Sequence, residues 1–252
     1  MPRHAKTASG TVKNIKTGSD VAALVTRHLA IQRSQNANDA KAPAKKKSGE
    51  KPKPAVQAGP RAQPQKLPGE QQAKPGNEGA MQLRPRYMAP DYSGSGKLDG
   101  MAAIITGGDS GIGRAVAVLF AREGADVAIA YLSEHDDAGE TQAAVEAEGR
   151  RCFVMSGDVR KSAFCQRVVD RTLKTFGRLD ILVNNAAFQM HAESIEDLTD
   201  ERIDLTLQTN IGGYLRMARA AVPHLPNGGS IINTGSVVGL EGTANLVDYA
   251  AT

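Results

Sequence analysis

The 252-residue sequence is basic at its start and acidic afterwards: residues 1–100 hold 18 Lys and Arg against 7 Asp and Glu, whereas residues 101–252 hold 13 against 20. It has no run of about 18 apolar residues, its five histidines lack metal-ligand spacing, and it holds two cysteines. Composition therefore argues against a membrane span, a metal centre and a disulfide-built domain, and it favours a cytoplasmic protein with reduced thiols.

Residues 1–92 are predicted to be a disordered arm. Lys, Pro, Gln, Ala and Gly dominate this stretch and aromatic residues are scarce, so it cannot bury enough apolar surface to offset the entropy lost on ordering. One helix is expected within it, from a cap at Ser19 and Asp20 to about Gln32, with Leu24 and His28 on one face. Such a helix either forms transiently without a partner or docks on the rest of the protein.

The most basic part of the arm runs from Ala40 to Pro54 and contains three consecutive lysines, Lys45 to Lys47. Its composition resembles that of histone-like tails, which bind any polyanion through phosphate neutralisation without reading bases. The alternative is a solvated linker, which continues through the Pro- and Gln-rich stretch 60–90. In either case we expect the arm to be open to proteases and dispensable for what the rest of the chain binds.

After Gly100 the pattern becomes that of an α/β domain, which we place at residues 97–252. Short apolar runs alternate with longer segments of helical spacing. This alternation predicts right-handed βαβ units and a Rossmann-like, doubly wound parallel sheet, incomplete at about five strands. The expected strands are Met101–Thr106, Asp126–Leu132, Arg151–Ser156, Leu179–Val183 and Ser230–Thr234, and the expected helices are Gly111–Glu123, Glu134–Glu148, Arg160–Phe176 and Asp200–His224.

The strongest motif is the glycine-rich string Thr106–Gly113, which lies where the first strand should give way to a helix. Glycines there let the backbone turn tightly and approach a pyrophosphate without side chains in the way. The free N–H groups at the start of the helix then face the negative charge. We therefore expect a dinucleotide phosphate site formed by Thr106, Gly107, Ser110, Gly111, Ile112 and Gly113.

The spacing Thr-Gly-x-x-x-Gly-x-Gly resembles the pattern of the short-chain dehydrogenase/reductase family, in its subgroup with extended N-termini. Further segments match that family in order along the chain. They are Asp158-Val159 after the third strand, Asn184-Asn185-Ala186-Ala187 after the fourth, Asn210 in the long helix, and Ser236 followed thirteen positions later by Tyr249. The resemblance implies that Asp158, Val159, Asn185 and Ala186 contact the cofactor, while Ala187 stands where the family has glycine.

The resemblance also implies the chemistry, which is hydride transfer between a nicotinamide ring and the carbonyl or alcohol carbon of a small molecule. Tyr249 would be the general acid and base, although a phenol titrates near ~10 and needs a neighbouring positive charge to act near neutral pH. Ser236 would hydrogen-bond the substrate oxygen, and Asn210 would hold the water that relays protons.

The choice of cofactor is expected to depend on the end of the second strand, where an acid would bind the ribose 2′-hydroxyl of NAD. The sequence has Tyr131, Leu132 and Ser133 at this cofactor-binding position. The missing acid favours NADP slightly over NAD, with Ser133 and Arg114 as the expected contacts of the 2′-phosphate.

The family places a lysine four residues after the tyrosine, whereas this sequence stops one residue earlier, at Thr252. Without that charge, and with a terminal carboxylate nearby, the phenolate is disfavoured, so we expect the 252-residue chain to be nearly inactive. Two alternatives are a nucleotide-binding remnant without catalysis and a polyanion-binding protein that acts through its arm. A homo-oligomer is expected only of a chain with a complete C-terminal part.

Overall fold

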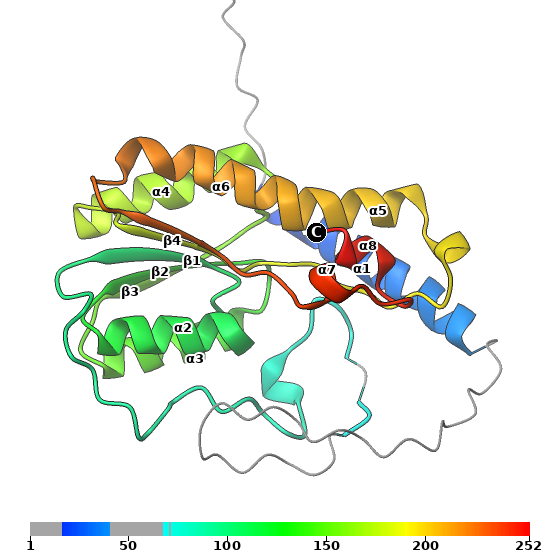
Figure 1. Cartoon of the computed structure of the whole chain (residues 1–252), viewed down its shortest axis with the longest axis horizontal. Coiled ribbons are helices and arrows are strands. Elements are labelled where there is room, and N and C mark those ends of the chain that lie inside the picture. Colours follow the sequence, from blue (N-terminus) through cyan, green and yellow to red (C-terminus); the bar gives the residue numbers. More distant parts are fainter. Residues whose placement is uncertain (1–16, 41–67, 71) are drawn as a thin grey trace, which may run out of the picture.

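A computed structural model describes residues 17–40, 68–70 and 72–252 of the chain (Figure 1). Within these residues a five-stranded sheet carries helices on both faces, as the sequence predicts. The lysine-rich run expected to bind polyanions lies, apart from Ala40, outside the described residues. None of the described helices combines the length and the apolar character that crossing a membrane requires.

The sheet is parallel throughout, and its strand order is β3-β2-β1-β4-β5. The strands are β1 (Ala102–Thr106), β2 (Asp126–Tyr131), β3 (Cys152–Ser156), β4 (Ile181–Asn184) and β5 (Ser230–Asn233). The order reverses between β1 and β4. In open α/β sheets, ligands bind in the crevice beyond the carboxyl ends of the strands at such a switch point. The predicted doubly wound sheet is confirmed, and it locates the candidate site next to β1 and β4.

The two faces of the sheet have separate helical layers (Figure 1). One layer consists of α2 (Gly111–Arg122) and α3 (His135–Ala147), and the other of α4 (Ser162–Phe176) and α6 (Tyr214–Ala221). Successive residues of β1 enter opposite layers: Ile104 packs in the cluster that includes Phe164 of α4, and Ile105 packs in the cluster that includes Ala117 of α2. Because both faces are covered, the central strands appear in the sequence as continuous apolar runs.

The segment predicted as one helix from Asp200 to His224 is divided in the structure. It begins as α5 (Asp200–Leu207), passes through a π-helical turn (Gln208–Gly213) into α6, and ends in a 3₁₀ turn (Val222–His224). A π turn inserts an extra residue into the helical ladder, and the spacing of apolar residues does not reveal it. Asn210 lies in this turn, so the irregularity falls at a predicted site residue.

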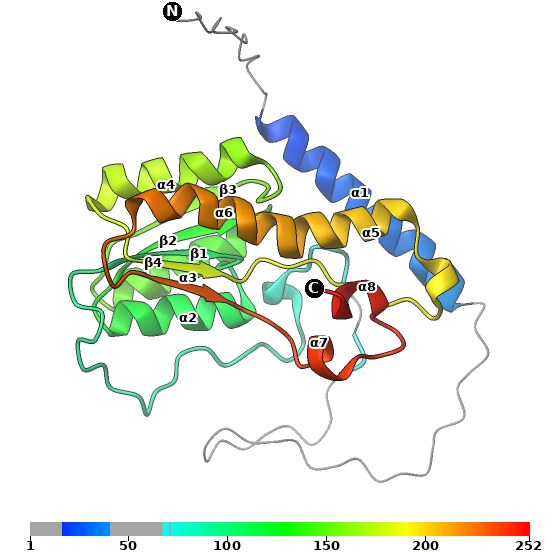
Figure 2. The same cartoon turned by 45° about the horizontal axis from the view of Figure 1, so that its top comes forward.

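The chain after β5 returns to the carboxyl edge of the sheet. A 3₁₀ turn (Ile195–Asp197) precedes α5, and two short helices follow β5, namely α7 (Val238–Glu241) and α8 (Val247–Ala250). α8 lies against α5 (Figure 2). This packing brings Tyr249, on α8, to the edge of the sheet where the glycine-rich loop lies.

The helix predicted in the arm is longer than expected, and it docks on the rest of the protein. α1 (Thr17–Asp39) passes α5 at an angle (Figures 1 and 2). Leu24 is buried in an apolar cluster that includes Phe188, and Arg27 forms an ion pair with Glu201 of α5 at 2.5 Å. The structure therefore favours the docking alternative, because the apolar face of α1 has a partner.

Part of the stretch expected to be a linker also has defined contacts. It contains a 3₁₀ turn, η1 (Glu78–Ala80), and farther along Arg84 and Tyr87 both hydrogen-bond the carboxylate of Glu140 on α3, at 2.5 and 3.0 Å. Disorder does not describe these residues. Composition is misleading here because hydrogen bonds and ion pairs to Arg114 of α2 and Glu140 of α3 hold the segment, although it buries little apolar surface.

Candidate active site

The loop between β1 and α2 has a backbone that favours glycine at two positions. Gly107 has a φ of +61° and Gly111 a φ of +52°, which residues with a Cβ rarely adopt. A Cβ on Gly113 would lie 1.9 Å from the carbonyl oxygen of Gly107. Ser110 precedes the helix without a side-chain capping bond, so the first N–H groups of α2 must find acceptors elsewhere.

Thr106 ties the end of β1 to the segment after β4. Its hydroxyl accepts hydrogen bonds from the backbone N–H groups of Asn185 at 2.9 Å and Ala186 at 3.0 Å. The side-chain amide of Asn185 in turn donates to the carbonyl of Gly107 at 3.0 Å. Thr106 is buried and does not line the cavity beside it. In the structure it positions the loop, where the motif alone suggests direct contact with a cofactor.

A cavity of about 540 Å³ opens between this loop, the carboxyl ends of the central strands and α8, and we call it the main cavity. Its volume is within the range of small-molecule sites. It brings together ten predicted cofactor residues, namely Gly107, Ser110, Gly111, Ile112, Tyr131, Leu132, Asp158, Val159, Asn185 and Ala186. Gly113 supports the loop from behind, and Ser133 borders a neighbouring cavity of about 360 Å³, here called the side cavity.

The three predicted catalytic residues meet around a further cavity of about 340 Å³. Asn210, Ser236 and Tyr249 all line it, and Tyr249 lines the main cavity as well. Tyr249 therefore stands at the border of the two spaces. Tyr214 also lines both, and sequence reasoning missed it. Its position one helical turn after Asn210 was the available signal.

Hydrogen bonds hold these residues to the surrounding loops. The Asn210 side chain accepts from the N–H of Phe188 at 2.7 Å, and it donates to the carbonyl of Phe188 and to the hydroxyl of Thr252, both at 3.0 Å. Asn210 thus joins the segment after β4 to the segment after α8, and its role as a water holder stays a prediction. Ser236 accepts from the N–H of Val238 at 3.2 Å, which leaves its proton for another acceptor.

Tyr214 is a neutral donor at this site. Its hydroxyl donates to the carbonyl of Thr234 at 3.1 Å. Burial raises the pKa of Tyr214 to about 12, and the neighbouring Tyr249 adds to the rise. A phenol with this pKa keeps its proton at neutral pH, so Tyr214 is unsuited to act as the base.

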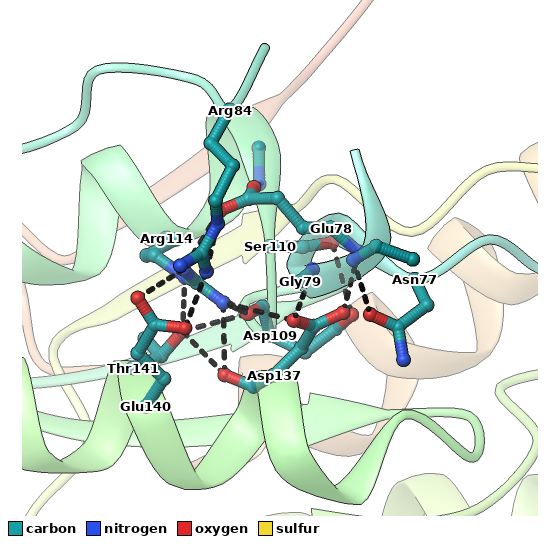
Figure 3. A network of polar contacts seen from close by, with 12 residues as sticks. Asn77, Glu78, Gly79, Arg84, Asp109, Ser110, Arg114, Asp137, Glu140 and Thr141 are labelled. Carbon is teal, nitrogen blue, oxygen red and sulfur yellow. Dashed lines mark hydrogen bonds and ion pairs between the residues drawn. The ribbon is translucent and has the colours of Figure 1, made fainter. Parts of the chain in front are cut away.

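Arg114, predicted to contact a 2′-phosphate, is committed to other partners. Its buried side chain lies among three acids, at 2.7 Å from Glu78, 3.1 Å from Glu140 and 3.5 Å from Asp137 (Figure 3). Its Nε also donates to the hydroxyl of Thr141 at 2.8 Å. The prediction is wrong at this residue, because the guanidinium already neutralises acids inside the protein.

Asp109, in the glycine-rich loop, lines the main cavity near other acids. Burial raises the pKa of Asp109 to about 6, and the carboxylates of Glu134 and Asp137 add to the rise. Between about pH 4 and pH 6 the folded chain therefore keeps a proton that the unfolded chain has lost. The titration of Asp109 therefore lowers the free energy of unfolding as the pH rises across this interval.

Asp109→Asn should remove that loss of stability. The free energy of unfolding of Asp109→Asn minus that of the wild type should therefore increase by about 2–3 kcal/mol between about pH 4 and pH 7, since two pKa units correspond to that amount. Urea unfolding at several pH values across the interval measures the difference, and Asp170→Asn on the exposed side of α4 is the control. A difference between Asp109→Asn and wild type that is the same at every pH would contradict the assignment.

The main cavity also has lining residues that the sequence did not indicate. They belong to the arm and are Leu24, His28, Lys74, Pro75 and Gly76. Only the cap and the apolar face of α1 gave a signal, and residues 74–76 have nothing that distinguishes them from the rest of a basic, proline-rich stretch. The expectation that the arm is dispensable for binding does not fit this geometry, because the arm forms part of the cavity wall.

Comparison with known proteins gives a consistent assignment. Residues 101–252 match the family model for short chain dehydrogenases. The chain is 49% identical over 185 residues to the uncharacterized oxidoreductase YhdF of Bacillus subtilis, and 43% identical over 188 residues to the chloroplastic NADPH-dependent aldehyde reductase 1 of Arabidopsis thaliana. These matches cover 73% and 72% of this chain, and 64% and 65% of the relatives. The chain therefore spans just under two thirds of the length of these relatives.

Solved structures show the same likeness. A short chain dehydrogenase from Burkholderia cenocepacia, in complex with NADP, is 39% identical, with a TM-score of 0.59 over 62% of this chain and 63% of that chain. A short chain dehydrogenase from Mycobacterium paratuberculosis, bound to NAD, is 34% identical, with a TM-score of 0.58 over 62% of each chain. Both forms of the dinucleotide thus occur in proteins that are similar to this chain.

Proposed function

The chain belongs to the short-chain dehydrogenase family, and on that premise we propose that it transfers a hydride between NADP or NAD and a small carbonyl or alcohol compound. The observation that carries the proposal is the position of Tyr249, which borders the main cavity on one side and the cavity of Ser236 and Asn210 on the other. A cofactor in the first space and a substrate in the second would meet at this phenol.

The residues around the main cavity fit a dinucleotide. The glycine-rich loop forms a cradle that a Cβ on Gly113 would fill. The N–H of Gly111 is bonded by the Glu78 carboxylate at 2.5 Å, and the next N–H groups at the start of α2 favour a phosphate. Asp158 and Val159, at the end of β3, are suited to the adenosine half. When bound, the nicotinamide ring supplies or accepts the hydride.

The chain's own residues would handle the proton and orient the substrate. Tyr249 would donate its phenolic proton to the carbonyl oxygen during reduction and recover it during oxidation. Ser236 would donate a hydrogen bond to the same oxygen and stabilise the charge that develops on it. Asn210, fixed by its bonds to Phe188, would keep the loop between the two cavities in place.

Aldehydes are the first substrate class to test, because the Arabidopsis relative is named an aldehyde reductase. A cytoplasmic location is supported by the two cysteines, which are free thiols in the structure. Burial raises the pKa of Cys152 to about 12 and that of Cys165 to about 11, so both resist the thiolate chemistry that oxidation requires.

Tyr249→Phe tests the proposal. It should leave NADPH affinity unchanged and slow aldehyde reduction by about a hundredfold or more, because the proton donor is removed. The loss of NADPH absorbance with a panel of aldehydes and ketones measures the rate. The assay uses the 252-residue chain and a chain continued past Thr252 with the C-terminal part of the Bacillus relative.

Tyr92→Phe, at an exposed tyrosine that lines neither cavity, is the matched control. Equal rates for Tyr249→Phe and wild type would remove Tyr249 from the mechanism. NADPH binding without reduction by either wild-type chain would favour the alternative of a nucleotide-binding protein.

A further inference from the structure

The N-terminal arm forms one wall of the main cavity. Five arm residues line it, namely Leu24, His28, Lys74, Pro75 and Gly76. Pro75 and Gly76 also border the side cavity, together with Ser133 and Glu134 from the segment after β2. The arm therefore reaches the end of β2, where dinucleotide folds place the adenosine ribose and its 2′ position.

Glu78 anchors this part of the arm on the glycine-rich loop. One carboxylate oxygen accepts the N–H of Gly111 at 2.5 Å, and the other pairs with Arg114 at 2.7 Å (Figure 3). The backbone N–H groups of Glu78 and Gly79 donate to the carboxylate of Asp137 at 2.7 and 3.1 Å. These bonds are largely buried, so the turn is tied both to the start of α2 and to α3.

α1 holds the same segment from the other side. The side-chain oxygen of Gln32 accepts the backbone N–H of Lys74 at 2.8 Å, and its amide donates to the carbonyl of Gln72 at 2.6 Å. Lys74 is thus held between α1 and the anchor at Glu78. Its position at the cavity is set by both contacts rather than by a free chain.

Lys74 brings an uncompensated positive charge to the cavity. Within the described part of the chain no acid pairs with its ammonium group, and burial lowers its pKa. Both ring nitrogens of the neighbouring His28 are buried without a hydrogen-bond partner among the described residues. Buried polar groups are normally satisfied, so the unpartnered His28 ring beside an ammonium group that no described acid pairs with points to a polar, anionic ligand.

We propose, on the premise of the function proposed above, that Lys74 binds the 2′-phosphate of NADP and that the docked arm thereby makes the protein prefer NADP to NAD. Arg114 does not compete for this role, because it pairs with Glu78. Glu134 is the first acid after β2 in the sequence. Its carboxylate accepts hydrogen bonds from the N–H and the hydroxyl of Ser133, at 3.2 and 2.8 Å. It is therefore engaged away from a ribose hydroxyl, which favours NADP further.

The test compares Lys74→Gln with Lys74→Arg. Dissociation constants for NADPH and NADH are measured by nicotinamide fluorescence, with adenosine 2′,5′-bisphosphate and 5′-AMP as fragment probes. Lys74→Gln should weaken NADPH and the bisphosphate roughly tenfold to a hundredfold, the size of a charge-assisted hydrogen bond, and leave NADH and 5′-AMP unchanged. Lys74→Arg should keep most of the NADPH affinity. Lys174→Gln, at an exposed lysine of α4, is the matched control.

The NADPH-to-NADH affinity ratio decides the outcome. A ratio unchanged by Lys74→Gln, whether both affinities fall or neither does, would overturn the role of Lys74 while leaving the proposed oxidoreductase function standing. A wild-type chain that binds NADH as tightly as NADPH would also overturn it. Failure of the wild type to bind either nucleotide would instead count against the proposed function.

Glu78→Ala separates anchoring from recognition. Glu78 positions the arm without lining the cavity. Its loss should therefore weaken the binding of NADPH and NADH together. Where the arm detaches, the preference for NADPH should fall to that of Lys74→Gln. Circular dichroism and thermal unfolding check that each variant is folded. Full retention of NADPH affinity and preference by Glu78→Ala would contradict the role of the docked arm.

Discussion

Gly113→Ala is expected to abolish measurable binding of NADPH and NADH. The added methyl group would lie 1.9 Å from the carbonyl oxygen of Gly107 and 2.8 Å from the side-chain nitrogen of Asn185. Non-bonded heavy atoms need roughly 3.5 Å, so the loop has to move away from α2 and its phosphate cradle is lost. Titration of nicotinamide fluorescence measures the effect.

Gly139→Ala is the matched control, because a Cβ there meets no atom within 4 Å and the residue lies inside α3. This change should leave binding intact and raise stability by about 0.5–1 kcal/mol. Gly111→Asn is a second test. A Cβ at Gly111 has open space, and asparagine tolerates a positive φ, so this variant should fold while its side chain occupies room that phosphates need. Normal affinity in both Gly113→Ala and Gly111→Asn would refute the phosphate role of the loop.

Arg202→Met should lower the free energy of unfolding by about 3–5 kcal/mol, because it removes the positive charge paired with the buried carboxylate of Asp248 and leaves, among the described residues, only the hydroxyl of Thr206 to bond it. Arg202 is 2% exposed, and two of its nitrogens each lie 3.1 Å from the carboxylate of Asp248. It also donates to the carbonyls of Met190 and His191. Urea unfolding measures the loss.

The same pair sets the position of Tyr249, the residue after Asp248. In the chain continued past Thr252, Arg202→Met should therefore also slow carbonyl reduction while NADPH affinity changes little. Arg27→Met is the control, since the ion pair of Arg27 and Glu201 is about half exposed, with side chains 40% and 55% exposed, and surface pairs contribute at most about 1 kcal/mol. A loss of stability no greater for Arg202→Met than for Arg27→Met would show that the buried pair has little net effect.

The predictable part of the site is the part encoded by local backbone chemistry. The glycine-rich loop was identified because a tight turn before a helix requires glycine at fixed spacing, and Ser236 and Tyr249 because the family spaces them thirteen residues apart. The structure brings these residues to one edge of the sheet. The error at Arg114 has the opposite origin. A basic residue near a phosphate loop suggests a phosphate contact, but its acidic partner Glu78 lies 36 residues away.

The parallel α/β sheet and the position of the glycine-rich loop are predictable from the sequence, because hydrophobic period and glycine placement act over a few neighbouring residues. The docking of α1, the place of Lys74 in the cavity wall and the contact between Arg202 and α8 are seen only in the folded chain. These features depend on pairs far apart in the chain, such as Gln35 and Arg202, which are separated by 167 positions. A contact of that kind leaves no periodic pattern in either segment. It exists only once hydrophobic burial has assembled the sheet and its helices, and polar side chains then pair across the surfaces that have met.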